Sequence, residues 1–365
     1  MALFEELKRR RVFQVAVGYI VIGWALIEGA ATLFPMFNAP QWVPQSVTVL
    51  ILLGFPVAIL MAWALQITPD GIAKDHGPAT APADPGAIRF VTASDGVQLA
   101  YAITGDGPRM VKTAHWLTHL ELDWESPVWG HWIGALAEGR QLLRYDQRGN
   151  GLSDRNPAIL SLDAMVSDLE CVVEASGFDR FPLVGSSQGG PVSIAYAVRH
   201  PERVSALIIY GSYAKGWSMR EDPELVAREK AMVDLVRVGW GQDNPAFRQM
   251  FQSLFIPDAS PAQAESFDDT MRTTASPDVA ARLLQELGNI DVTEYLSQVR
   301  VPTLVLHVRD DARIPFSQGR AIASCIPGAE FVSLEGRNHI ILEHEPAFGH
   351  FTRSVNEFLD AHPNQ

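Results

Sequence analysis

The chain has 365 residues, 47% of them hydrophobic, and a formal net charge of −13 at pH 7. This acidic balance argues against nucleic acid as a partner, because its phosphates would be repelled. The length suits one large α/β domain with an additional segment. The cysteines, Cys171 and Cys325, lie in apolar helical patterns without disulfide or metal-ligand spacing, so we expect reduced core residues and no metal or cofactor.

Two long apolar runs open the chain. The run 12–34 has Glu28 as its only charge, and the run 47–67 has none. At about 1.5 Å per residue, each could cross a hydrocarbon core of roughly 30 Å. A cleaved signal peptide would not explain the second run, and a buried soluble hairpin would normally show a polar stripe. We therefore predict a membrane anchor at residues 1–67 with two transmembrane helices, and a lipid bilayer as partner.

The basic stretch at residues 8–11 sets the expected orientation. It precedes the first run, whereas the connection 35–46 has no Lys or Arg. Positive flanks stay in the cytoplasm, so we expect everything after residue 67 to face the cytoplasm. Glu28 would snorkel near the outer helix end or pair in an oligomer. The spacing Ala25-x-x-x-Gly29 would allow a homodimer through the hairpin.

A sheet pattern follows a predicted linker. Residues 68–86 hold four prolines and three glycines and have no hydrophobic period, which is typical of a linker. Strand and helix patterns then alternate, which predicts an α/β fold with a mostly parallel sheet covered on both faces, over residues 87–213 and 298–365. The strands are expected at 88–93, 97–104, 110–117, 141–145, 204–210, 301–308 and 329–334, with helices at 129–138, 162–175 and 191–199.

Residues 214–297 interrupt this alternation with helical patterns and no strand. Insertions at the carboxyl end of such a sheet usually overhang the site, so we predict a helical cap. Five apolar side chains of the cap would form either a lid surface or the cap's own core. They are Trp217, Trp240, Met250, Phe251 and Phe255.

The pattern Gly185-x-Ser187-x-Gly189 ends an apolar run that begins at Phe181 and precedes a helical pattern. Strand, sharp turn and helix place Ser187 at the tip, and glycine is needed where the strand and helix backbones nearly touch. A serine hydroxyl is a weak nucleophile, so it requires a neighbouring base and an acid that orients the base.

An acid and a histidine follow in the order that this topology uses. Asp310 and Asp311 come directly after the strand that ends near residue 308, and His339 comes after the next strand. Catalytic groups of open α/β sheets gather at such strand ends. We expect Ser187 as nucleophile and His339 as general base and acid, with an aspartate from the 310–311 pair to orient it.

The chain from about residue 87 resembles the cap-bearing members of the α/β-hydrolase superfamily. The resemblance is carried by Asp146-x-Arg-Gly-x-Gly-x-Ser-Asp154, the serine motif, Asp311-x-x-Ile-Pro315 and Gly336-x-x-His339. It implies that Asp311 is the acid, with Asp310 as the fallback, and that Arg148 and Asp154 brace their loop. The helical hairpin is similar to the membrane segment of some bacterial adenylate cyclases and regulators, which implies a bacterial inner membrane.

The resemblance also concerns the oxyanion hole. It implies backbone N–H donors from Gln188, at the start of a helix, and from the loop after the third strand. That loop usually has His-Gly-x, whereas this chain has His115-Trp116-Leu117. By position the donor is Leu117, with Trp116 second, and the tryptophan would narrow the acyl pocket or rotate the loop.

Other polar and aromatic residues have two interpretations each. His115 and His119 could suggest a metal pair, but no third ligand has suitable spacing, so oxyanion-loop or structural roles are favoured. Trp124, Trp129 and Trp132 could line the pocket or pack a helix on the sheet. We expect His344 and His350 at the surface or at a helix cap.

The sequence therefore predicts a membrane-tethered serine hydrolase that cleaves a carboxylic ester or lactone of a small-molecule acyl substrate through an acyl-enzyme. A serine, rather than the aspartate of related dehalogenases and epoxide hydrolases, favours acyl chemistry. Thioester hydrolysis, C–C bond hydrolysis and cofactor-free perhydrolysis remain alternatives. A different class is a non-catalytic ligand sensor that signals through the hairpin.

Overall fold

The structure is a computed structural model that describes residues 12–36, 40, 42–68, 71–74, 84–240, 242, 244 and 246–363. The chain divides into two compact units, Met1–Gly77 and Pro78–Gln365. The boundary falls inside the predicted linker.

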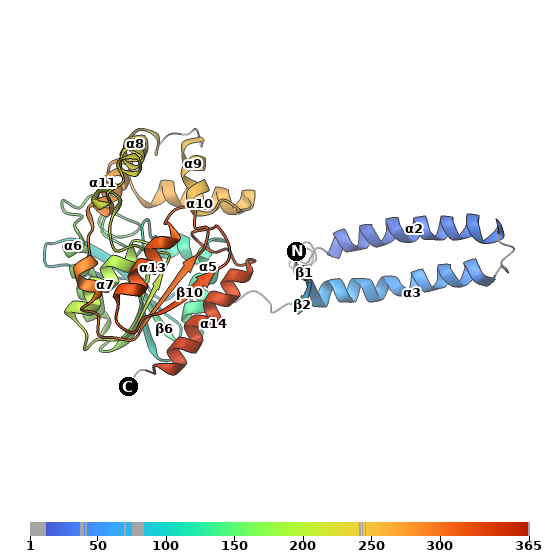
Figure 1. Cartoon of the computed structure of the whole chain (residues 1–365), viewed down its shortest axis with the longest axis horizontal. Coiled ribbons are helices and arrows are strands. Elements are labelled where there is room, and N and C mark those ends of the chain that lie inside the picture. The colour runs from blue at the N-terminus through green and yellow to red at the C-terminus, as the bar shows by residue number, and fades with distance from the viewer. Residues whose placement is uncertain are drawn as a thin grey trace. The chain divides into compact units, whose positions relative to one another are not determined.

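The first unit contains a helical hairpin. Helix α2 (Val12–Met36) and helix α3 (Trp42–Ala64) lie side by side (Figure 1). The Tyr19 hydroxyl donates a hydrogen bond of 2.8 Å to the carbonyl of Ile51. A Cβ at Gly23 would lie 2.9 Å from Ile51 Cγ2, so this glycine allows the two backbones to approach closely.

The prediction of two transmembrane helices is not supported. Within the described residues, we find no helix with both the length and the apolar character needed to cross a bilayer. The second run also stops being helical at Ala64, because Leu65–Thr68 form strand β1, which pairs antiparallel with β2 (Gly71–Lys74). These strands lie partly in the predicted linker, and the β-branched residues Ile67, Thr68 and Ile72 favour them. The basic stretch 8–11 lies outside the described residues.

The second unit is built on an eight-stranded sheet with the order β10-β9-β8-β7-β5-β6-β4-β3. Strand β4 runs antiparallel to both neighbours, and the other pairs are parallel. The strands are β3 (Arg89–Thr92), β4 (Gln98–Thr104), β5 (Arg109–Lys112), β6 (Gln141–Tyr145), β7 (Phe181–Ser186), β8 (Val204–Tyr210), β9 (Thr303–Val308) and β10 (Glu330–Leu334). This confirms the predicted mostly parallel sheet.

The register of the central strands sets the position of the site. Ser186 at the end of β7 pairs with Tyr210 at the end of β8, and Tyr210 pairs with Leu306 near the end of β9. All residues of these three strands are buried, which explains their nearly continuous apolar sequences. The loops that follow the three strands therefore leave the sheet at one edge.

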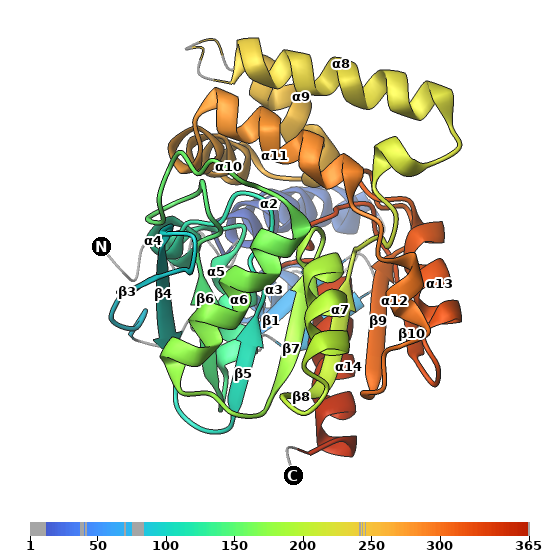
Figure 2. The same ribbon diagram turned by 90° about the vertical axis from the view of Figure 1, so that its left-hand side faces the viewer.

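Helices cover both faces of the sheet (Figure 2). One face carries α5 (Gly130–Ala137) and α14 (Pro346–Ala361), which meet where the rings of Trp132 and Phe351 lie 4.4 Å apart between centroids. The other face carries α6, α7 and α12, and α13 packs against β9. Their bounds are α6 (Leu162–Ser176), α7 (Gly189–Arg199), α12 (Thr293–Leu296) and α13 (Phe316–Cys325).

The predicted cap is a layer of helices over the carboxyl edge of the sheet (Figure 2). It consists of the 3-10 turn η1 (Trp217–Met219), α8 (Pro223–Gly239), α9 (Ala246–Phe255), α10 (Pro261–Thr274) and α11 (Pro277–Asn289). Its two connections run together at the base, where Gly216 N donates to Ile290 O (2.7 Å) and Val292 N to Ala214 O (2.9 Å). Since α12 packs beside α7, the layer is shorter than the predicted 214–297.

One local prediction was wrong, and one helix was missed. Strand β5 ends at Lys112 instead of residue 117, because the backbone turns and Leu117 adopts a φ of 62°, which no strand allows. Helix α4 (Leu120–Glu125) was not predicted; the His119 side chain accepts the backbone N–H of Leu122 at its start.

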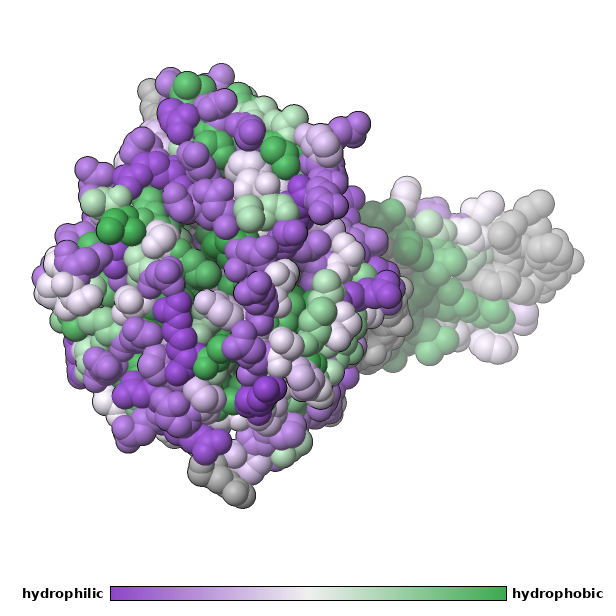
Figure 3. All heavy atoms as spheres, turned by 60° about the vertical axis from the view of Figure 1, so that its left-hand side comes forward, coloured by the Kyte–Doolittle hydropathy of each residue, from purple (hydrophilic) through white to green (hydrophobic). Residues whose placement is uncertain are grey.

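Polar side chains dominate the face of the second unit seen in Figure 3.

Candidate active site

Ser187 lies in the turn between β7 and α7 with a φ of 51°. Non-glycine residues rarely adopt this left-handed conformation, which costs on the order of 1–3 kcal/mol. A Cβ at Gly185 would lie 2.7 Å from the Gly189 carbonyl oxygen, so the strand and helix backbones do nearly touch, as expected. The turn is held by Ser187 N donating to Tyr210 O (2.9 Å) and by the Ser212 hydroxyl donating to Ser187 O (2.6 Å).

His339 and Asp311 meet at the same edge from the loops after β10 and β9. His339 Nδ1 lies 2.7 Å from Asp311 Oδ2, and both side chains are buried. The other carboxylate oxygen accepts the backbone N–H groups of Arg313 (2.8 Å) and Ile314 (2.9 Å). Asp310 is exposed. The structure thus brings Asp311, and not the fallback Asp310, to the histidine.

The surroundings keep Asp311 charged. Burial alone would raise its pKa, but His339, His307 and the backbone donor Ile314 outweigh burial and lower the pKa below its usual value. A charged Asp311 accepts a hydrogen bond from the Nδ1–H of His339, so the other ring nitrogen, Nε2, is left as the basic one. His307 Nε2 lies 3.5 Å from Asp311 Oδ2, and burial lowers the pKa of His307.

Two residues that the sequence did not single out fix the histidine. The Tyr210 hydroxyl donates to the carbonyl of His339 at 2.7 Å. Gly211 has a φ of 54°, and a Cβ there would lie 3.2 Å from His339 Cε1. A larger residue would therefore crowd the imidazole. In the sequence, the feature that could have indicated this position is the glycine directly after the apolar strand β8.

The loop after β5 lies against the start of α7. A Cβ at Gly189 would be 2.9 Å from the carbonyl oxygen of Ala114. In this loop Leu117 has a φ of 62°. Leu117 and Ser187 are the only non-glycine residues with positive φ in the described part of the chain. The two predicted oxyanion donors, Leu117 and Gln188, thus lie in adjoining segments, each of which contains a residue in this strained conformation.

Trp116 joins this loop to the cap. Its ring stacks on Phe255, with centroids 5.5 Å apart and planes 17° apart, and contacts Phe251 and Trp240 at 5.0 and 5.6 Å. Phe255 in turn packs edge-on to His339 at 5.6 Å. Phe251 and Trp240 are buried, whereas Met250 is exposed. The cap aromatics therefore include both core and site-lining residues, and Met250 belongs to neither.

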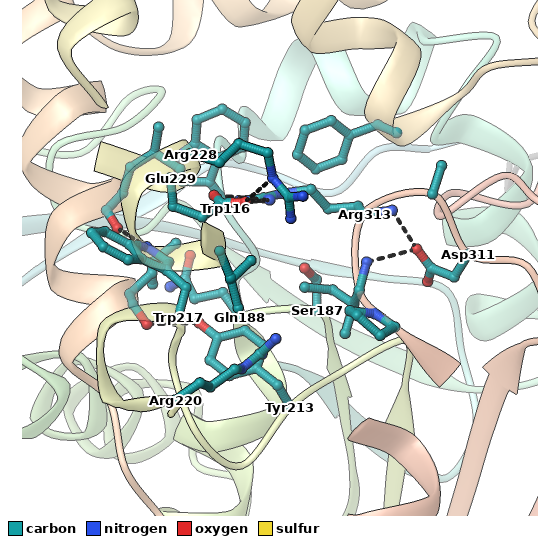
Figure 4. A pocket seen from close by; sticks show the side chains of 17 residues that line it. Trp116, Ser187, Gln188, Tyr213, Trp217, Arg220, Arg228, Glu229, Asp311 and Arg313 are labelled. Carbon is teal, nitrogen blue, oxygen red and sulfur yellow. Dashed lines mark hydrogen bonds and ion pairs between the residues drawn. The ribbon is translucent and has the colours of Figure 1, made fainter. Parts of the chain in front are cut away.

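Ser187 borders two cavities that also share Trp116 and Phe255. The larger, of about 130 Å³, extends under the cap and reaches Asp311 and Gln188 (Figure 4). The smaller, of about 20 Å³, is lined by His339, Leu117, Trp129 and cap residues. Ser187 therefore lies beside both cavities, next to Trp116 and Phe255.

Buried polar groups lie in and around the loop after β5. Both ring nitrogens of His115 lack a hydrogen-bond partner, and the ring packs on Trp129 with centroids 3.9 Å apart. Burial lowers the pKa of Lys112 and raises that of Asp123. Among the described residues no group of three or more His, Cys, Asp or Glu could hold a metal.

The loop after β6 is braced as the resemblance implied. Arg148 binds both oxygens of Asp168, at 2.7 and 2.6 Å, and Asp95 at 2.7 Å. Asp154 accepts the backbone N–H of Gln98 at 2.7 Å. Trp132 packs on the core and donates to Ile341 O (2.9 Å), so it does not line the cavities, while His344 and His350 are exposed.

Comparison with known proteins defines the class. The sequence pattern of the α/β hydrolase fold matches residues 121–346. With the parallel sheet and the strand–serine–helix turn already described, this shows that the chain belongs to the α/β-hydrolase family.

Particular relatives are hydrolases. Pyrrolizixenacetamide deacetylase of Xenorhabdus hominickii is 26% identical over 242 residues, which cover 65% of this chain and 86% of that protein. RutD of Caulobacter sp. (strain K31), provisionally named a carbamate hydrolase, is 30% identical over 208 residues, which cover 55% and 74%. The esterase EaEST of Exiguobacterium antarcticum has the same fold, with a TM-score of 0.61 at 23% identity over 74% of this chain and 98% of that chain. The similarity to the first two proteins supports a hydrolase function, and the similarity to the third shows the fold.

Proposed function

We propose that this protein is a serine hydrolase that cleaves a carboxylic ester or lactone through an acyl-enzyme. The observation that carries the proposal is the 2.7 Å contact between His339 and Asp311 beside a cavity that His339 shares with the strained Ser187. Ser187 acts as nucleophile, His339 as general base and then acid, and Asp311 as the group that orients His339.

The reaction proceeds in two halves. His339 Nε2 takes the proton of the Ser187 hydroxyl while the serine oxygen attacks the carbonyl carbon of the substrate. The imidazolium formed on His339 then protonates the leaving alkoxide. Water, deprotonated by the same nitrogen, releases the acid and regenerates the serine. The backbone N–H groups of Gln188 and Leu117 stabilise the oxyanion; losing one such donor costs about 2.7–4 kcal/mol in this kind of site.

The relatives favour acyl chemistry. Their names describe a deacetylase, a carbamate hydrolase and an esterase, all of which attack a carbonyl carbon. Ser187→Ala is expected to abolish turnover of p-nitrophenyl acetate with an unchanged circular dichroism spectrum. Retained turnover in this variant would refute the proposal. A non-catalytic sensor would neither turn over the ester nor react with a fluorophosphonate probe, so labelling of the wild type at Ser187 separates the two functions.

We also propose that the hairpin attaches the enzyme to a bacterial inner membrane, with the hydrolase unit in the cytoplasm. Support comes from the uncharged sequence 47–67 and from large apolar side chains exposed on α2 and α3. These include Ile20, Val21, Ile22, Trp24, Leu26, Leu50, Leu52 and Leu53. The full chain should sediment with membranes and resist carbonate extraction, and protease added to the periplasmic side should spare the hydrolase unit. Release by carbonate would contradict membrane insertion.

A further inference from the structure

Three arginines line the larger cavity together with Ser187. They are Arg220, which follows η1, Arg228 on α8, and Arg313 in the loop after β9 (Figure 4). Apart from Asp311, which is engaged by His339, the lining contains one carboxylate, Glu229. The cavity therefore holds more positive than negative charge in a chain whose net charge is −13.

Glu229 accounts for only one of these arginines. Arg313 Nη1 lies 3.1 Å from both carboxylate oxygens of Glu229, and the exposed fractions of the two side chains are 13% and 10%. Arg228 Nε lies 4.0 Å from Glu229 Oε1, and 70% of its side chain is exposed. Arg228 is thus at the limit of an ion pair, and its guanidinium remains available at the mouth of the cavity.

Among the described residues, the hydrogen-bond partner of Arg220 is a backbone carbonyl and not a carboxylate. Its Nε donates to the carbonyl of Lys215 at 2.9 Å, and its guanidinium carbon lies 6.0 Å from the centre of the Tyr213 ring. Burial lowers its pKa below the usual value and repulsion from Arg313 adds to this effect, so attraction by Tyr213, Glu229 and Asp222 does not fully compensate the charge. A partly buried guanidinium with an unmet charge favours a carboxylate, which it can bind through two parallel N–H groups.

Apolar side chains line the same cavity as Ser187 and the arginines. They include Trp217, Leu225, Leu284 and Leu287. This arrangement suits a hydrocarbon chain or ring that ends in an anion. We infer that the substrate carries a free carboxylate in addition to the acyl bond that is cleaved, and that Arg220 and Arg228 bind this carboxylate under the cap. The inference rests on the proposed serine hydrolase function and deepens it by naming the substrate class.

Paired substrates test the inference with the full-length protein. The carboxylate lies on the acyl side in mono-p-nitrophenyl glutarate, with its methyl ester as the neutral partner, and on the leaving-group side in 4-acetoxybenzoate, with methyl 4-acetoxybenzoate as the neutral partner. Wild type should show a higher kcat/KM for the charged member of at least one pair. A preference for the neutral member in both pairs would overturn the inference.

Variants assign the preference to the arginines. The double variant Arg220→Met, Arg228→Met loses both guanidinium groups. Its ratio of kcat/KM for the charged substrate to kcat/KM for the neutral substrate should be at least tenfold lower than in wild type. The loss should appear mainly in KM, because charge-assisted hydrogen bonds to the substrate are lost. Arg237→Met on α8 is the matched control, since Arg237 pairs with Asp234 outside the cavity and its loss should leave the ratio unchanged. Equal ratios in the double variant and wild type would refute the assignment.

A measurement without turnover separates this inference from the proposed function. Glutarate should slow labelling of Ser187 by a fluorophosphonate in wild type, and at least tenfold more glutarate should be needed in the double variant. If Ser187→Ala keeps its esterase activity, the proposed function fails. If Ser187 is labelled and required but glutarate has no effect and neutral substrates are preferred, only the carboxylate inference fails.

Discussion

Trp116 stacks on Phe255 with ring centroids 5.5 Å apart. One residue belongs to the loop that carries a proposed oxyanion donor, and the other belongs to cap helix α9 and contacts His339. The residue that departs from the usual family pattern thus links the oxyanion loop to the cap. A glycine at this position could not make the link.

We expect Trp116→Gly to lower the free energy of unfolding by roughly 3–5 kcal/mol, because a buried aromatic side chain is lost from a packed cluster. The enlarged space should also shift the preferred p-nitrophenyl ester towards longer acyl chains. Urea denaturation and a C2–C8 ester series measure the two effects. Met250→Ala, on the exposed side of α9, is the control and should change neither. An unchanged chain-length preference in Trp116→Gly would show that Trp116 does not limit the acyl pocket.

The sheet and the positions of the three proposed catalytic residues could be predicted because both depend on the local pattern of apolar residues along each strand. Ser187, Asp311 and His339 each follow a parallel strand, and the register of such a sheet places those strand ends at one edge. The early end of β5 was missed because apolar residues continue to Leu117 while the backbone turns. Hydrophobic pattern does not encode that turn.

Contacts between distant segments could not be predicted. The stacking of Trp116 on Phe255 joins residues 139 positions apart in sequence, as their numbers show. The three cavity arginines come from the segment after η1, from α8 and from the loop after β9, and in sequence each resembles an ordinary surface residue. Their common position depends on how the cap folds back over the sheet, which its amphipathic helices alone do not specify.

The hydrogen bond between Asp311 and His339 predicts a large kinetic effect. Asp311→Asn should lower kcat for p-nitrophenyl acetate by about 10³–10⁴-fold, because the amide stabilises the wrong imidazole tautomer and cannot stabilise the imidazolium. The change should leave KM nearly unaltered. Asp310→Asn is the neighbouring control, since Asp310 is exposed, and it should retain nearly full activity. The reverse ranking of the two variants would make Asp310 the orienting acid.

The buried pair of Arg148 and Asp168 should contribute to stability rather than to chemistry. Both side chains are 1% exposed and lie 2.6 Å apart. Arg148→Met should lower the free energy of unfolding by about 3–5 kcal/mol, because Asp168 would be left buried without its partner. Arg148→Lys should lose less, since it keeps the charge but not the two-pronged contact. Arg237→Met, which removes an exposed pair, should cost under about 1 kcal/mol in the same urea titration. Equal losses in Arg148→Met and Arg237→Met would contradict this view of the loop.

The raised pKa of Asp146 predicts how the free energy of unfolding depends on pH. Burial raises its pKa from 3.8 to about 8, an effect that Asp123 reinforces and the backbone N–H of Leu152 opposes. The folded protein therefore holds this proton more tightly than the unfolded chain. Raising the pH from about 4 to about 8 releases the proton first from the unfolded chain, so stability falls over this range and the contribution levels off above it.

Asp146→Asn removes this titration and keeps an oxygen that can accept the N–H of Leu152. Between pH 4 and 8, the free energy of unfolding of wild type should fall relative to the variant by up to about 1.4 kcal/mol per pH unit. Urea titrations at several pH values measure the difference, and Asp106→Asn, at an exposed position, should run parallel to wild type. If the wild type gained stability relative to Asp146→Asn as the pH rose, Asp146 would have to be charged in the folded protein and held by a cation, with Arg144 the nearest candidate among the groups that lower its pKa.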